Sequence, residues 1–330
     1  ARERVSSLYQ QQGDTKSALY HLDLLIKDDF DNADYLLRKA ALQLSNNQRA
    51  DAEKTLSIAR NFINDDAGKL IAYADQARSI GNDEDALDAM ARAYEIANSS
   101  TFVTLRYTSL LLDLQNNDKA QSLLTSIPKD QQQNPVYHFL KGRLEANKGK
   151  NDRAIAAFEK ALDVDSTFAQ AFIAIYNYAL NEQFVDVFLN TARKLIAENE
   201  NNLLAKNLLA QYLFFIQEFD ESIALYKALI EEPNLLNPAE AYNRLAIMHI
   251  ETSLVTAKNY ARQAYELQPN SAKILDTYGH IKALQGDYEG SLKMLRDAFA
   301  RDANDPNIRY HLGYTLAKLN RIEEAKKELE

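Results

Sequence analysis

The sequence predicts an all-α protein in which short helix pairs stack as an α-solenoid. The main observation is a ladder of small residues at a fixed spacing of 34, namely Ala18, Ala52, Ala86, Ala120 and Ala154. A constant period of this size is typical of stacked-repeat proteins. The chain also holds only 9 glycines and 6 prolines in 330 residues, which favours helices joined by short turns.

Residues 135–166 show the predicted repeat unit most clearly. Two helical segments flank a turn at Gly149, with Gly142 on the first helix and Ala154 and Phe158 on the second. Small residues at facing positions let two helices lie close together, and Phe158 fills the space beside them. These positions are therefore interpreted as structural.

The same positions recur along the whole chain. The predicted turn positions are Gly13, Asn47, Gly81, Gln115, Gly149, Gln183, Gln217, Gly286 and Asn320. Gly and Asn tolerate the positive φ that a short interhelical turn requires. The ladder on the second helix continues as Phe188, Ser222, Ala257, Ser291 and Ala325. A helix pair repeated about ten times accounts for both series.

These residues carry a family resemblance. The pattern resembles the tetratricopeptide repeat, with Leu312 and Gly313 in the first helix, the turn sequence Gly286, Asp287, Tyr288, and Ala264 followed by Pro269. The resemblance covers the entire chain, with incomplete first and last repeats. It implies a right-handed superhelical α-solenoid of about ten repeats.

The domain organisation predicted over residues 1–330 is a single solenoid, read as a fragment of a longer protein. Two proline-bounded segments, residues 128–135 and 232–238, interrupt the period and are candidate flexible seams. The alternative, that both segments are ordinary long loops, is favoured, because short helix–helix connections dominate such stacks.

The sixth repeat departs from the pattern. Tyr176 and Phe188 occupy both small positions, within the aromatic series Phe168, Phe172, Tyr176, Tyr178, Phe184 and Phe188. Two bulky residues in place of two small ones should push the helices apart or shift their register. A locally repacked core is favoured over a ligand pocket, although this is the first place to look for a cavity.

Composition and motifs argue against several classes of function. The net charge is −9 with no basic stripe, which argues against a nucleic-acid partner. No run of apolar residues is long enough for a transmembrane segment. Cysteine is absent, and the five histidines lie in separate repeats without a metal-binding motif. We therefore expect no catalytic residues, metal or cofactor, and a protein that is not an enzyme.

The resemblance places binding on the first helices of the repeats, which line the inner, concave wall of a tetratricopeptide stack. The inward positions carried onto this sequence are Phe102, Leu105, Leu112, Val136, Phe139, Arg143, Ile173, Asn177, Asn207, Gln211, Phe214, Asn243, Tyr310 and Tyr314, with His280 beside the last two. This wall is apolar, aromatic and rich in amides. Amide side chains suit an extended peptide backbone and, equally, sugar hydroxyls.

A closer resemblance concerns residues 308–330 and 37–52. They are similar to the large repeat lipoproteins that accompany the exosortase/PEP-CTERM sorting system, the PrsT-like family. That likeness implies a periplasmic scaffold for protein partners, outer-membrane-anchored in full length, in exopolysaccharide export or surface-protein sorting. Three alternatives stay open: a glycan-binding module guiding a polysaccharide, the repeat region of an enzyme whose catalytic domain lies elsewhere, and a cytoplasmic location.

Overall fold

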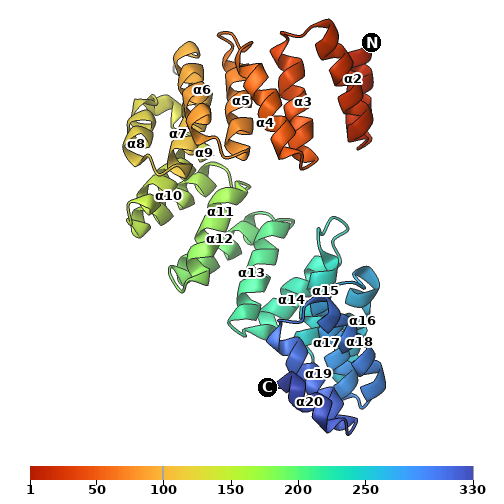
Figure 1. Ribbon diagram of the computed structural model, residues 1–330. Helices are drawn as coiled ribbons and strands as arrows, with labels where there is room; N and C mark the ends of the chain where they lie inside the picture. Colours follow the sequence, from red (N-terminus) through yellow and green to blue (C-terminus); the bar gives the residue numbers. More distant parts are fainter. Residues whose placement is uncertain (99, 330) are drawn as a thin grey trace. The chain divides into compact units, whose positions relative to one another are not determined.

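The structure, a computed structural model, describes residues 1–98 and 100–329. In these residues it consists of twenty α-helices and one short 3-10 helix, with no strand (Figure 1). The chain divides into two compact units, Ala1–Ala171 and Phe172–Glu330. The predicted all-α solenoid fold is confirmed.

The first unit contains five helix pairs and the start of α11. Each even-numbered helix packs on the odd-numbered helix before it. The helices α2, α4, α6 and α8 also contact the odd-numbered helix that follows. The elements are α1 (Arg2–Gln11), α2 (Thr15–Asp28), α3 (Ala33–Ser45), α4 (Arg49–Arg60), α5 (Ala67–Ser79), α6 (Asp83–Ile96), α7 (Thr101–Asp113), α8 (Asn117–Ser126), η1 (Lys129–Gln131), α9 (Pro135–Asn147), α10 (Asn151–Val164) and α11 (Ala169–Leu180).

The second unit contains the remainder of α11 and the helices after it. The same pairing holds from α13 to α20, each odd-numbered helix contacting the next even-numbered one. The elements are α12 (Val185–Glu198), α13 (Leu203–Phe215), α14 (Phe219–Ile230), α15 (Pro238–Met248), α16 (Leu254–Leu267), α17 (Ala272–Leu284), α18 (Tyr288–Arg301), α19 (Pro306–Lys318) and α20 (Ile322–Leu329).

The turns lie where the period predicts them. Eight of the nine predicted turn residues have φ between 59° and 84°, a left-handed conformation that reverses the chain between two helices. Gln183 is the exception, because the positive φ values in its turn fall on Glu182 (58°) and Phe184 (54°). The turn of the sixth repeat is therefore built differently from the others.

The small-residue ladder is buried throughout. Nine of its ten members are fully buried and the tenth, Ala325, is 3% exposed. Gly142 shows why size matters at the facing position, because a Cβ atom there would lie 2.4 Å from Phe158 Cε1. The period thus encodes the close approach of the two helices in each repeat.

The sixth repeat is a repacked aromatic core, as the sequence favoured. Phe188 is fully buried, and its ring lies 5.6 Å from Phe172, 5.3 Å from Tyr176 and 5.2 Å from Tyr212, centroid to centroid. Such offset and edge contacts stabilise aromatic clusters beyond simple burial. Rings from α11, α12 and α13 therefore form the core of the sixth repeat, where the other repeats have small residues at the ladder positions.

The two proline-bounded segments are loops between helix pairs. The first runs from the end of α8 through η1 to α9, where Asn134 accepts a hydrogen bond from the N–H of Val136 at 2.8 Å. The second joins α14 to α15, where Asn237 caps the helix through the N–H of Glu240. Pro135 and Pro238 occupy the first turn of α9 and α15, where the missing N–H costs nothing. Flexibility at these loops stays a prediction.

Candidate functional site

The odd-numbered helices, the first of each pair, are called the wall helices below. Within the first unit α3 contacts α5 and α7 contacts α9, and within the second unit α17 contacts both α15 and α19. Wall helices of successive pairs therefore lie side by side. Their shared face is the surface on which the family resemblance places a partner.

A series of ionic contacts joins the wall helices of the first unit. Each contact links a basic side chain to the wall helix before it. The pairs are Arg38 with Glu3 at 3.7 Å, Lys69 with Asp34 at 3.1 Å, Arg106 with Asp75, and Arg143 with Asp113 at 2.6 Å. All are partly exposed, so each contributes about 0–1 kcal/mol to stability. Their larger effect is to set polar groups at regular intervals along the wall.

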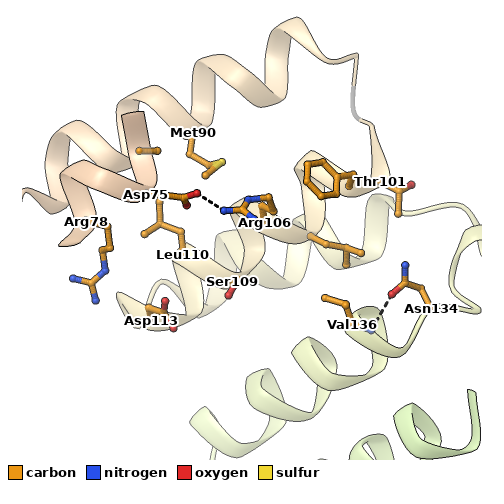
Figure 2. A pocket seen from close by; sticks show the side chains of 13 residues that line it. Asp75, Arg78, Met90, Thr101, Arg106, Ser109, Leu110, Asp113, Asn134 and Val136 are labelled. Atoms are coloured by element: carbon orange, nitrogen blue, oxygen red, sulfur yellow. Dashed lines mark hydrogen bonds and ion pairs between the residues drawn. The ribbon is translucent and has the colours of Figure 1, made fainter. Parts of the chain in front are cut away.

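A cavity of about 580 Å³ opens between α5, α7 and the start of α9 (Figure 2). This volume lies within the range of about 300–1,000 Å³ that is usual for ligand pockets. The lining residues are Ala74, Asp75, Arg78, Met90, Thr101, Phe102, Leu105, Arg106, Ser109, Leu110, Asp113, Asn134 and Val136. We call this cavity the first groove.

The first groove combines apolar side chains with paired charges. Phe102 is 63% exposed, and the guanidinium of Arg106 lies 5.8 Å from the centre of its ring. Figure 2 shows Arg106 turned toward Asp75, with which it forms an ion pair. Arg78 is likewise bound, to Asp83 at 2.6 Å. Because these charges are already paired, the groove offers apolar area without a strong net field.

Three of the six wall residues predicted in the first unit line this groove: Phe102, Leu105 and Val136. Arg143 lies beside it through its bond to Asp113. Phe139 instead packs between the rings of Phe158 and Phe168, at 5.7 and 5.6 Å, and Leu112 is 1% exposed in the core. The sequence did not identify the ion-paired side chains around Phe102.

A second cavity, of about 410 Å³, lies in the second unit at the ends of α11 and α13. We call it the second groove. Its lining residues are Tyr176, Leu180, Gln211, Phe214, Phe215, Gln217, Phe219 and Arg244. It contains two predicted residues, Gln211 and Phe214, and lies next to the repacked core of the sixth repeat. Tyr176 belongs to both the core and the groove.

The other predicted residues of the second unit do not line a described cavity. Ile173 and Asn177 are exposed on α11, Asn207 is partly buried on α13, and Asn243 on α15 is only 3% exposed. On α19, Tyr310 is exposed and Tyr314 partly buried, with the ammonium of Lys318 5.4 Å from the Tyr314 ring centre.

Two histidines from neighbouring wall helices stack on one another. The rings of His280 and His311 are 3.9 Å apart and nearly parallel, and His311 Nδ1 lies 2.8 Å from Asp276 Oδ1. Burial, and secondarily the adjacent His311, lowers the pKa of His280 to about 4. The sequence analysis predicted no contact between these histidines, because they are 31 residues apart and lie in separate repeats. In the described residues no group of three or more His, Asp or Glu is arranged to hold a metal ion.

Within residues 1–98 and 100–329, no helix is both long enough and apolar enough to cross a bilayer.

Tetratricopeptide-repeat profiles match residues 1–213 and 282–330. The TPR repeat-containing protein YpiA of Bacillus subtilis (strain 168) is 23% identical over 284 residues, 84% of this chain. The chain spans 65% of the length of that curated relative.

Solved structures with a similar arrangement include PilW, described as a type IV pilus biogenesis factor, and YrrB, described as a TPR protein with an unusual peptide-binding site. PilW is 15% identical with a TM-score of 0.49, covering 59% of this chain and 90% of PilW. YrrB is 20% identical with a TM-score of 0.44, covering 56% of this chain and 95% of YrrB.

The tetratricopeptide fold suggests a scaffold for protein or peptide partners, and proteins built from this repeat are generally non-catalytic. The profile match covers well over half of the chain, and the wall helices, turns and buried ladder follow the same repeat. This chain belongs to the tetratricopeptide repeat family.

Proposed function

We propose that this chain is a non-catalytic scaffold that binds an extended peptide segment of a partner protein along the wall helices, with the first groove as its main site. The observation that carries the proposal is the cavity beside Phe102, a large apolar side chain left mostly exposed on a wall helix. An exposed aromatic beside a groove is a common anchor of peptide recognition.

The chemistry of the first groove suits a peptide ligand. Phe102 and Val136 supply the accessible apolar area for side chains of an extended segment, and the buried Leu105 and Leu110 line the cavity beside them. In the ion pair beside them, Asp75 can accept a hydrogen bond from a peptide N–H and Arg106 can donate one to a peptide carbonyl, and neither charge is left uncompensated. Leu112 and Asn243 are buried and line neither groove, so the proposed site leaves them out.

The proposal is tested by selecting binders from a random dodecamer peptide library displayed on phage. The strongest binder is then labelled with fluorescein and titrated by fluorescence anisotropy. Phe102→Ala should weaken its binding about tenfold or more, because it removes the exposed anchor. Phe30→Ala is the matched control, since Phe30 is an equally exposed phenylalanine of the same unit that does not line the groove. Equal effects of the two substitutions would contradict the proposal.

We propose further that the full protein acts in the bacterial envelope, as a periplasmic scaffold in exopolysaccharide export or surface-protein sorting. The support is the resemblance of residues 308–330 and 37–52 to the PrsT-like repeat lipoproteins. Fractionation of cells producing the full-length protein tests this location. Recovery with periplasmic or outer-membrane markers is expected, and recovery with cytoplasmic markers would contradict it.

A polysaccharide remains the alternative ligand, favoured by exposed aromatic rings such as Phe102 and Tyr310 that can stack on sugars. Competition separates the two ligand classes: soluble alginate or dextran should leave peptide binding unchanged if the groove is a peptide site. A catalytic domain encoded next to this region would instead favour the third hypothesis, that the chain is the repeat region of an enzyme.

A further inference from the structure

The second groove has a composition that the repeat pattern does not require. Its lining includes four aromatic rings, Tyr176, Phe214, Phe215 and Phe219, together with Leu180. Phe214 and Phe219 contact each other with centroids 5.9 Å apart. Phe215 is 61% exposed, and Phe219 and Leu180 are more than one third exposed. An apolar surface gathered around a cavity in this way marks a binding site more often than scattered exposed residues do.

The groove arises from the exchange of residue sizes in the sixth repeat. Where the fifth repeat has Gly142 on the wall helix and Phe158 on its partner, the sixth has Tyr176 and Ala192. Tyr176 contacts Phe188 on one side and lines the groove on the other. At these two positions the large residue lies on the wall helix instead of the second helix, which places an additional ring at the wall.

Arg244 is the single charged residue among those that line the second groove. Its guanidinium lies 4.4 Å from the centre of the Phe214 ring, and its Nε donates a hydrogen bond to Glu240 Oε1 at 2.8 Å. Its two terminal nitrogens donate to no group in the part of the chain that the structure describes. Burial raises the pKa of Tyr176, and the nearby charge of Arg244 opposes this rise.

Two amides complete the polar side of the groove. Gln211 and Gln217 line it, and in the described residues neither side chain makes a hydrogen bond to the protein. Each amide offers both a donor and an acceptor, as an extended peptide backbone requires. An arginine that already stacks on a ring still has its outer N–H groups free for a carboxylate.

We propose that the second groove is a specificity pocket for an aromatic side chain that stands next to a carboxylate in a bound peptide. The rings of Phe214, Phe215 and Phe219 enclose the aromatic group, and the terminal nitrogens of Arg244 bind the carboxylate. This assignment rests on the proposed peptide-binding function and adds the chemistry of the partner. The local chemistry supports it, because Arg244 pairs with Glu240 through Nε alone and keeps its terminal nitrogens available as donors beside the rings.

The test uses three synthetic, fluorescein-labelled peptides with a common Gly/Ser background. The first contains Phe followed by Glu and has an amidated C-terminus. The second replaces that Glu with Gln, and the third ends in Phe with a free terminal carboxylate. The first should bind at least tenfold more tightly than the second, because one charge-assisted hydrogen-bond pair is lost. Tight binding of the third would assign the carboxylate to the peptide terminus and would equally support the pocket.

Variants connect that binding to the pocket. Arg244→Gln should reduce the affinity for the first peptide to that for the second and leave the second unchanged, while Phe214→Leu should weaken both. Phe102→Ala, in the first groove, should alter neither affinity, so a failure of the proposed main site remains distinguishable from a failure here. Equal affinity of wild type for all three peptides, or binding unaffected by Arg244→Gln in a variant with an unchanged circular dichroism spectrum, would overturn the inference.

Discussion

Gly142 on α9 lies so close to Phe158 on α10 that a Cβ atom on residue 142 would come within 2.4 Å of Phe158 Cε1 and 3.1 Å of the carbonyl oxygen of Ala154. The same relationship recurs at two other repeats. A Cβ on Gly279 would lie 2.8 Å from Leu295 Cγ, and one on Gly313 would lie 2.7 Å from Leu329 Cγ. In all three pairs the residues are 16 positions apart, so one packing solution is used repeatedly.

The first prediction concerns this contact. Gly142→Ala should destabilise the first unit by about 1–3 kcal/mol, the usual cost of overpacking. This loss should exceed the gain of up to about 1 kcal/mol from the better helix propensity of Ala. Urea denaturation followed by circular dichroism measures the change. Adding Phe158→Leu should recover part of the loss by making room, whereas a Gly142→Ala variant as stable as wild type would contradict the packing argument.

The second prediction concerns two buried tyrosines. Tyr226 is 1% exposed, and its hydroxyl has no hydrogen-bond partner in the described residues. Burial raises its pKa above the usual range for tyrosine. Since an unsatisfied buried hydroxyl costs about 1–3 kcal/mol, Tyr226→Phe should leave stability unchanged or raise it by about 1 kcal/mol.

Tyr73 is the matched control for that substitution. It is equally buried, but its hydroxyl donates to Asp85 Oδ2 at 3.0 Å. Tyr73→Phe should therefore destabilise the protein by about 1 kcal/mol. Thermal denaturation of both variants gives the comparison, and a larger loss from Tyr226→Phe than from Tyr73→Phe would show that the Tyr226 hydroxyl is satisfied.

The third prediction concerns the stacked histidines. The pKa of His280 falls from the usual 6.5 to about 4, first through burial and then through the charge of His311. Between these values the unfolded chain binds more protons at this site than the folded chain does. Its contribution to stability is therefore present above pH 6.5 and is lost as the pH falls toward 4.

Partial exposure reduces the expected size of this effect to about 1–2 kcal/mol. His280→Gln removes the titrating group, so the free energy of unfolding of the variant should fall less steeply than that of wild type between pH 6.5 and 4. Urea titrations at several pH values measure both slopes. Parallel curves for the two proteins would mean that His280 titrates alike in the folded and unfolded states.

The fourth prediction concerns the ionic contacts between wall helices. Because Arg143 and Asp113 are partly exposed, Arg143→Ala should destabilise the first unit by no more than about 1 kcal/mol, and 0.5 M salt should reduce the difference. Arg153 on α10 is exposed and serves as the control, so Arg153→Ala should have no salt-dependent effect. A loss of several kcal/mol for Arg143→Ala would show that this pair holds the wall together.

The sequence predicted the fold because the fold is local and repeated. Ala18 and its counterparts stay buried in every repeat, and the period alone identifies the turns at Gly13 and Gly149. The wall positions were harder to predict. A helix turns about 100° per residue, so a shift of one position in the alignment to the family moves a side chain off the inward face while the hydrophobic period stays the same. Leu105, Leu112 and Asn243, three of the residues predicted on the wall, are buried.

Other parts of the site depend on side-chain contacts between repeats, which the 34-residue period does not predict. Arg106 reaches Asp75 and His311 reaches His280, in each case 31 residues back along the chain, through side-chain conformations that the sequence does not specify. The second groove follows from a departure from the repeat. The large residue at position 176 was visible in the sequence, but its neighbours Phe219 and Arg244 come from helices that only the folded stack brings together.

Hydrogen–deuterium exchange of the 330-residue chain, with and without the peptide selected from the dodecamer library, tests the central claim most directly. The account predicts that bound peptide slows exchange in α5, α7 and the start of α9, with little change in α4, α6 and α8. Protection confined to the second helices of the pairs, with none on α5, α7 and α9, would contradict the assignment of the wall helices as the binding surface.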